Sequence, residues 1–288
     1  MKVLVTGANG FVGQNLLVRL REEKIEFTTF VRDDSLIDLE EKIKNCGFIV
    51  HLAGVNRPKN EVEFTEGNTD LTIKIAEILD DIQLKIPVIY SSSIQAELDN
   101  PYGSSKKLAE DALIKLSEKN GNAVYNYRLP NVFGKWCKPN YNSAVATFCY
   151  NTINDLPIQV NDPTSLINLV YIDDVVDATV LSIEKDEANY EVFNVGTGER
   201  TDVMTVANSL KNIYNSDTEI TISGNYKLGD IKDNFADLEK IQLKLGFSPK
   251  INFESGIKRF CEWVNEQEVE DDKYEKSVVE MKEKGLYK

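Results

Sequence analysis

The sequence has few of the residues that bind metals or form disulfides. Its 288 residues include one histidine and four cysteines, and none of the cysteines belongs to a CxxC pair. Without a second histidine, zinc sites rich in histidine are excluded, so we expect no metal site and free, buried thiols. Long apolar runs are missing too, since none approaches the roughly 18 residues that a membrane-spanning helix needs.

Positive charge is also scarce. Lys and Arg number 33 against 47 Asp and Glu, which gives a net charge of −14. Such a surface repels nucleic acid, but it still allows a phosphate-bearing small ligand where cations and helix N-termini gather. The chain enters an apolar strand directly after Met1 and Lys2, without the apolar run of a secretory signal. We therefore expect a cytoplasmic protein with no nucleic-acid or membrane partner.

Short β-rich runs alternate with helical stretches through the first half of the chain. The predicted strands are 3–6, 26–31, 48–52, 87–91 and 123–129, and the predicted helices are 11–22, 36–45, 70–81 and 104–119. This alternation predicts an α/β fold with a doubly wound parallel sheet, because crossover helices cover both faces. We predict a dinucleotide-binding domain over 1–134, its sheet completed by strands near 167–172 and 192–195. Residues 135–288 would form mainly a smaller α/β substrate-binding lobe and C-terminal helices.

A glycine-rich turn joins the first strand to the first helix. Gly7 allows a tight turn, Gly10 lets the backbone approach a pyrophosphate, and Gly13 lets the helix pack on the sheet. Three glycines can serve a purely structural turn, but the strand and helix around them favour a Rossmann-type dinucleotide site. The residues expected to contact the cofactor here are Gly7, Asn9, Gly10, Phe11, Val12 and Gly13.

The end of the second strand bears on the choice of dinucleotide. Arg32 directly follows this strand and could pair with the 2′-phosphate of NADP(H). Asp33 or Asp34 could instead hold the ribose 2′-hydroxyl of NAD(H). The position of Arg32 favours NADP(H), with NAD(H) as the alternative.

A tyrosine and a lysine one helical turn apart follow the fourth strand. Tyr102 and Lys106 share a helix face, and Ser93 lies at the strand end before them, at the carboxyl edge where nucleotides bind. We expect Lys106 to lower the pKa of the Tyr102 phenol, so that Tyr102 transfers a proton near neutral pH. Ser93 would hydrogen-bond the same substrate oxygen. An ordinary surface Tyr and Lys is the plainer interpretation.

These motifs together resemble the extended short-chain dehydrogenase/reductase (NAD-dependent epimerase/dehydratase) family. Further segments that carry the resemblance are 51–54, Asn68, 128–134, 171–175 and 194–198. The resemblance implies that Ser93, Tyr102 and Lys106 are catalytic and that Tyr102 and Lys106 also contact the cofactor. It further implies that the cofactor is lined by Leu52, Ala53, Gly54 and Pro130, and that Asn131 lies near a nucleotide sugar.

Two narrower similarities point to different reactions. Segments 51–58, 91–106 and 134–151 are similar to the reductase domain of capsular-polysaccharide enzymes, which reduce the 4-keto group of a UDP-linked 6-deoxy-N-acetylhexosamine with NADPH. In those enzymes a cupin domain follows, which we do not expect here. Segment 229–237 is instead similar to nucleotide-sugar 4-epimerases.

One departure from the family concerns the substrate. Residues 166–169 read Leu-Ile-Asn-Leu, where many members carry an arginine that contacts the nucleotide pyrophosphate. We expect another cation to bind the substrate there, and the candidates are Lys135, Lys138, Arg200 and Lys232.

The combined interpretation is an NADPH-dependent reductase. It would reduce the C4 ketone of a UDP- or dTDP-linked 4-keto-6-deoxyhexose for surface-polysaccharide precursor synthesis. The alternatives are a nucleotide-sugar 4-epimerase with tightly bound NAD and a non-catalytic NAD(P)-binding protein. We expect a homodimer in which helices 70–81 and 104–119 pair across a two-fold axis, and a solvated helix over 266–284.

Overall fold

The computed structural model describes residues 1–288 except 142, 184–190, 225–234 and 268–288. Two compact units divide the chain. The first unit comprises Met1–Leu129, Asp173–Val195 and Asp237–Ser248, and the second comprises Pro130–Ile172, Gly196–Ala236 and Pro249–Lys288. In the described part of the chain, no helix is both long and apolar enough to cross a membrane.

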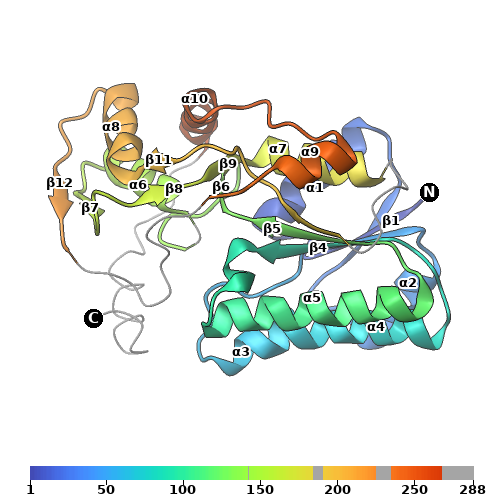
Figure 1. The fold of residues 1–288 in the computed structure, drawn as a ribbon. Coiled ribbons are helices and arrows are strands. Elements are labelled where there is room, and N and C mark those ends of the chain that lie inside the picture. The colour runs from blue at the N-terminus through green and yellow to red at the C-terminus, as the bar shows by residue number, and fades with distance from the viewer. Residues whose placement is uncertain (142, 184–190, 225–234, 268–288) are drawn as a thin grey trace. The chain divides into compact units, whose positions relative to one another are not determined.

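A six-stranded parallel sheet forms the centre of the first unit as the structure describes it, with the order β2-β1-β3-β4-β5-β10 (Figure 1). The strands are β1 (Val3–Thr6), β2 (Phe27–Phe30), β3 (Phe48–His51), β4 (Val88–Ser93), β5 (Val124–Leu129) and β10 (Glu191–Asn194). The chain proceeds from β1 to one side and from β3 to the other. The carboxyl ends of these two strands therefore form a topological switch point, where nucleotides bind to open α/β sheets.

Helices cover both faces of this sheet, which confirms the predicted doubly wound α/β fold (Figure 1). One face carries α2 (Leu36–Lys44), α4 (Leu71–Asp81) and α5 (Pro101–Asn120), and the other carries α1 (Phe11–Glu22), α7 (Ile172–Ile183) and α9 (Glu239–Leu245). Before α4 come α3 (Val62–Phe64) and a π-helical turn, Thr65–Asp70, and a 3-10 turn, Ile94–Glu97, precedes α5. Leu4, Ile49, Leu79 and Leu113 are fully buried between the sheet and the α2, α4 and α5 layer. Burial on both faces accounts for the uninterrupted apolar character of β1 and β3.

The second unit contains short paired strands and three helices in the residues that the structure describes. β6 (Asn131–Phe133) pairs with β9 (Leu169–Tyr171), β7 (Ile158–Val160) with β12 (Ile220–Ile222), and β8 (Leu166–Ile167) with β11 (Thr201–Asp202). The helices are α6 (Ala144–Ile153), α8 (Val203–Tyr214) and α10 (Phe253–Asn265). The Tyr214 hydroxyl donates to the Cys261 carbonyl at 3.3 Å and lies 3.5 Å from Cys149 Sγ, which joins the three helices. All four cysteines of the chain are buried and free.

The strand predicted near 167–172 is not part of the large sheet, so that prediction was wrong. β9 pairs with β6 instead, and Phe133 packs edge-on against Tyr171 with ring centroids 5.4 Å apart. The sheet edge beside β5 is taken by β10, where Phe193 packs edge-on against Tyr127.

Parts of two further predicted segments lie outside the described residues. They are 229–234 of the segment 229–237, which includes Lys232, and 268–284 of the predicted C-terminal helix.

Candidate active site

The glycines after β1 allow two loops to meet at the switch point. Gly7 has a φ of +66°, and a Cβ atom there would lie 2.6 Å from the backbone nitrogen of Ala53. A Cβ on Gly13 would lie 2.3 Å from the Gly7 carbonyl oxygen. Both distances are far shorter than a van der Waals contact. A larger residue at position 7 would force apart the loops after β1 and β3, and one at position 13 would force α1 away from the turn after β1. Leu52 and Ala53 are thereby held beside the glycine turn.

The first turn of α1 offers donors to an anion. Its N-cap is Gly10, which supplies no side-chain cap, and the turn, all of it described, contains no acidic residue. Asn9 and Gly10 are exposed, and Phe11 and Val12 are half-buried. Uncapped N–H groups at the positive end of a helix dipole attract phosphate groups. The glycine cradle and this helix end therefore fit the pyrophosphate of a dinucleotide.

The three charged residues of the loop after β2, Arg32, Asp33 and Asp34, differ in their hydrogen bonds and in their exposure to solvent. Asp34 accepts a hydrogen bond from Lys42 Nζ at 2.7 Å and one from the Val31 backbone nitrogen at 2.8 Å, and these bonds hold the pKa of its carboxyl below the usual value. Asp33 is exposed. Arg32 is also exposed, and among the described residues it makes no ion pair. Asp34 is thus committed to the turn, whereas the Arg32 guanidinium is accessible.

Tyr102 lies in the first turn of α5. This helix begins at Pro101, three residues before the predicted start. Asn100 is the N-cap and accepts a hydrogen bond from the Gly103 nitrogen at 2.8 Å, and Pro101 occupies the first helical position. A Cβ on Gly103 would lie only 2.1 Å from the Gln95 carbonyl oxygen. Glycine at this position therefore allows the helix to start against the 3-10 turn that follows β4.

The structure brings Ser93, Tyr102 and Lys106 together. Lys106 is only 4% exposed, and its Nζ donates to the Ser91 carbonyl at 2.9 Å. The same Nζ lies 5.9 Å from the centroid of the Tyr102 ring. Ser93 is buried, its hydroxyl oxygen accepts from the Gln95 nitrogen at 3.2 Å, and its side chain hydrogen-bonds Tyr102.

The pKa values of this group differ from the sequence-based prediction. Burial raises the pKa of Tyr102 to about 12, although a hydrogen bond with Ser93 acts in the opposite direction. Burial lowers the pKa of Lys106 to about 8, and the charge of Glu110 opposes that shift. The pKa of Tyr102 is therefore raised overall and not lowered as expected, because desolvation of the phenol outweighs the effects that favour its ionised form. Tyr102 is consequently a protonated donor at neutral pH.

The loop after β3 passes directly beside Lys106. A Cβ on Gly54 would lie 3.2 Å from Lys106 Nζ and 2.7 Å from Asn68 Oδ1. A larger residue at position 54 would therefore press on the ammonium. The loop after β3 therefore contacts the glycine turn through Leu52 and Ala53, and it contacts α5 through Gly54, which lies against Lys106.

Asn68 was absent from the predicted site residues, although the structure gives it a central place. It is fully buried, accepts from the Val55 nitrogen at 2.8 Å, and donates to the Val55 carbonyl and to Ser105 Oγ, each at 3.0 Å. Ser105 Oγ in turn donates to the Tyr102 carbonyl at 2.8 Å. Asn68 thus fixes the loop after β3 to the first turn of α5. The family resemblance, which included Asn68, was the available signal, but Asn68 lies in a π-helical turn that sequence periodicity does not predict.

The remaining predicted site residues belong to the second unit. They are Pro130, Asn131, Lys135, Lys138 and Arg200. Pro130 and Lys135 are half-buried, whereas Asn131, Lys138 and Arg200 are exposed. The Arg200 guanidinium lies over the Phe235 ring at 5.1 Å from its centroid.

The stretch 166–169, where the resemblance led us to look for an arginine, contains a buried amide. Asn168 is fully buried, and its Nδ2 donates to the Glu199 carbonyl at 2.6 Å. This bond fixes the loop that ends next to Arg200. Among the described residues, no group of three or more His, Cys, Asp or Glu side chains could hold a metal ion.

Comparison with known proteins identifies relatives along most of the chain. The model of the NAD dependent epimerase/dehydratase family matches residues 3–196. A UDP-2-acetamido-2,6-beta-L-arabino-hexul-4-ose reductase from Pseudomonas aeruginosa is 49% identical over 222 residues, which are 77% of this chain. The match spans 60% of the length of that reductase. A putative UDP-glucose 4-epimerase from Methanocaldococcus jannaschii is 26% identical over 91% of this chain and 98% of its own length.

Solved structures share the fold. A UDP-glucose 4-epimerase from Thermotoga maritima, solved with UDP-glucose, has a TM-score of 0.84 at 24% identity and covers 92% of this chain and 99% of its own. A Thermus thermophilus UDP-glucose 4-epimerase in complex with NAD has a TM-score of 0.84 at 21% identity, covering 93% of this chain and 100% of its own. At these identities the likeness shows the fold alone.

Proposed function

Because the chain belongs to the NAD dependent epimerase/dehydratase family, as its motifs predicted, we propose that it is an NADPH-dependent reductase. Its substrate would be the C4 ketone of a UDP- or dTDP-linked 4-keto-6-deoxyhexose, and its product a precursor of a surface polysaccharide. The P. aeruginosa relative, named as a reductase of a UDP-linked hexul-4-ose, supports this class of reaction.

The observation that carries the proposal is the position of the Tyr102 phenol, one helical turn from the buried Lys106, whose Nζ lies 5.9 Å from the centroid of the phenol ring. A ketone that receives hydride becomes an alkoxide and needs a proton in the same step. Tyr102, with a pKa raised to about 12, retains its proton throughout the neutral range. Lys106, 4% exposed and directed at the Ser91 carbonyl, provides a fixed positive charge next to the phenol.

The proposed chemistry adds one hydride and one proton. Reduced nicotinamide, when bound, supplies the hydride to C4. The Ser93 hydroxyl donates a hydrogen bond to the ketone oxygen, and Tyr102 transfers its proton to that oxygen as the carbon–hydrogen bond forms. The phenolate left on Tyr102 is stabilised by the Lys106 ammonium until water reprotonates it.

Cofactor binding is assigned to the first unit. Gly7, Gly10 and the uncapped first turn of α1 would hold the pyrophosphate, and the accessible Arg32 would pair with the 2′-phosphate. The accessible Arg32 supports NADPH, and NADH is the alternative, because Asp33 is exposed and the two bonds to Asp34 use only its Oδ2. Leu52, Ala53 and Gly54 would line the rest of the cofactor, and the resemblance to the family adds Pro130 of the second unit.

Substrate binding is assigned to the second unit. Asn131 would contact the nucleotide sugar, and Lys135, Lys138 and Arg200 would contact its pyrophosphate. A homodimer and a cytoplasmic location are further parts of this proposal.

Incubation of the protein with NADPH and a UDP-4-keto-6-deoxy sugar tests the reaction. We expect nicotinamide absorbance to fall in stoichiometric proportion to the alcohol formed. The 26% identical putative 4-epimerase keeps a second candidate open, and an altered UDP-hexose without net NADPH loss would favour it.

A Tyr102→Phe variant tests the assigned proton donor. We expect turnover to fall by roughly 100-fold or more while NADPH binding survives, because the ring remains and only the proton donor is lost. Retained turnover would reject the assignment, and a protein that binds NADPH but reduces no ketone would favour a non-catalytic role.

A further inference from the structure

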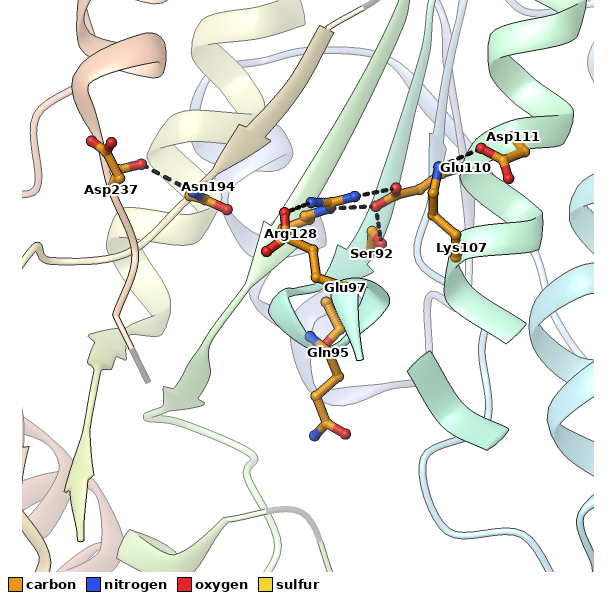
Figure 2. A network of polar contacts seen from close by, with 10 residues as sticks. Ser92, Gln95, Glu97, Lys107, Glu110, Asp111, Arg128, Asn194 and Asp237 are labelled. Carbon is orange, nitrogen blue, oxygen red and sulfur yellow. Dashed lines mark hydrogen bonds and ion pairs between the residues drawn. The ribbon is translucent and has the colours of Figure 1, made fainter. Parts of the chain in front are cut away.

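A buried ion pair joins β5 to α5, the helix that carries the proposed proton donor. Arg128 of β5 forks onto Glu110 of α5, with Nε 2.9 Å from Oε1 and Nη2 2.8 Å from Oε2. Ser92 Oγ donates to Glu110 Oε1 at 2.6 Å. Glu110 is fully buried, and Arg128 also pairs with Glu97, whose side chain is 73% exposed (Figure 2).

Glu110 lies on α5 one helical turn beyond Lys106, as Lys106 lies one turn beyond Tyr102. The three residues are spaced four apart on α5, so they share one helix face. Both Glu110 oxygens accept bonds from Arg128, and this fork fixes the plane of the carboxylate. A carboxylate held in this way cannot swing toward the lysine. The Lys106 ammonium points instead to the Ser91 carbonyl, at 2.9 Å.

Burial makes the charge of Lys106 dependent on its neighbours. The titratable groups around it are Tyr102 and Glu110 from its own helix, Tyr90 from β4 and His51 from β3. Burial raises the pKa of Tyr90 well above its usual value and lowers that of His51 to about 3, so both are neutral at pH 7. Tyr102 is neutral as well. The negative charge that faces Lys106 therefore comes from Glu110.

Arg128 pairs with two carboxylates, Glu110 and Glu97. The Glu97 side chain is 73% exposed and therefore screened by solvent, whereas Glu110 is buried one helical turn from Lys106. A negative charge near a desolvated ammonium favours its protonated form. A direct ion pair between Glu110 and Lys106 would have the same effect on protonation, but it would draw the ammonium away from Tyr102.

We propose that Glu110 is a positioning residue for Lys106. Held rigid by Arg128 and Ser92, its carboxylate supplies a fixed negative charge one turn behind the lysine. This charge keeps the buried ammonium protonated while leaving it free to serve Tyr102. The inference rests on the role proposed above for Lys106.

The pH dependence of kcat/KM for NADPH between pH 6 and 10 tests this role, because it reports ionisations of the free enzyme. For the wild type we expect a decline as the pH rises through about 8, where Lys106 loses its proton. Glu110→Gln should move this decline to lower pH by roughly half a unit or more, since the opposing negative charge is gone. Arg128→Gln should move it to higher pH, because the Glu110 carboxylate is no longer neutralised.

The matched control is Asp111→Asn. It removes the same charge from the next position of α5, where Asp111 pairs with Lys107 and is 39% exposed, so the decline should stay at the wild-type pH (Figure 2). If Glu110→Gln fails to fold, the double variant Glu110→Gln/Arg128→Gln removes the pair without leaving an unpaired buried charge. It differs from Arg128→Gln only in the Glu110 carboxylate, so its decline should lie at lower pH than that of Arg128→Gln, and equal declines would overturn the proposal.

A purely structural role for Glu110 predicts a different outcome. Melting temperature and turnover would then fall at every pH alike, with the decline unmoved, and that result in a folded variant overturns the proposal. The dissociation constant of NADPH, followed by fluorescence over the same pH range, gives a second readout. Because binding requires no ketone turnover, it tests Glu110 even if the wild type reduces no ketone, an outcome that would refute only the proposed reaction.

Discussion

The single histidine provides a sharp test of how burial sets charge in this fold. His51 is fully buried, with Nδ1 2.7 Å from Thr6 Oγ1 and Nε2 2.9 Å from Thr72 Oγ1. The Thr72 hydroxyl donates its proton to the Asn68 carbonyl at 2.7 Å, so it must accept from Nε2–H. Thr6 Oγ1 accepts from the Ala53 nitrogen at 3.1 Å and can donate its proton to Nδ1. This chain of bonds is complete with a neutral ring and has no place for a second ring proton.

The expected effect on stability follows from linkage. Burial, assisted by the charge of Lys106, lowers the pKa of His51 to about 3 in the folded protein, whereas in the unfolded chain it is near 6.5. Between these values the unfolded chain binds the extra proton, so the free energy of unfolding decreases as the pH falls below about 6.5. From pH 7.5 to pH 5.5 this one group should cost about 1.4 kcal/mol.

Urea unfolding of the wild type and of His51→Gln at both pH values measures this cost. Glutamine can still donate to Thr72 and accept from Thr6, but it does not titrate. We expect the variant to be less stable at pH 7.5, since its stacking on Tyr90 is lost, and the wild type to lose about 1.4 kcal/mol more than the variant on acidification. Equal losses in the two proteins would refute the reasoning.

Two further predictions concern the cofactor and assembly. Arg32→Ala should raise the KM for NADPH roughly 10- to 100-fold and leave that for NADH nearly unchanged, because only the former carries the 2′-phosphate; steady-state kinetics with both cofactors measure this, and an equal change would contradict the assigned contact. Leu108→Lys places a charge at a 54% exposed apolar position of α5, and light scattering should then find a monomer where the wild type is a dimer. A dimeric variant would exclude this helix face as the interface.

Local sequence patterns predicted the bounds of a helix correctly where the signals for its start and end lie within the helix or directly beside it. The helix predicted over 11–22 has these bounds, because a glycine turn precedes it and apolar residues recur along one face. The start of α5 was missed although Asn100 and Pro101 are ordinary N-terminal signals. The apolar periodicity begins later than these signals, and periodicity had determined the predicted boundary.

Properties that depend on contacts between distant parts of the chain could not be predicted from the sequence. β9 reads as a buried strand whichever partner it takes, and pairing with β6 was decided by tertiary packing. The pKa of Tyr102 depends on how deeply β4, α5 and the π-helical turn bury the phenol, which spacing does not reveal. Asn68 matters through bonds to residues 13 and 37 positions away.

Reduction and oxidation make opposite demands on this phenol, which separates the two candidate reactions. An epimerase must first oxidise an alcohol and so needs Tyr102 as a base, yet burial raises the pKa of Tyr102 and keeps the phenol protonated at pH 7. Epimerisation should therefore accelerate as the pH rises from 6 to 8. A reductase uses the protonated phenol that is already present, so its kcat/KM should stay level until Lys106 titrates near pH 8. A reductive rate that climbs steadily between pH 6 and 8 would contradict the role of Tyr102 as the acid.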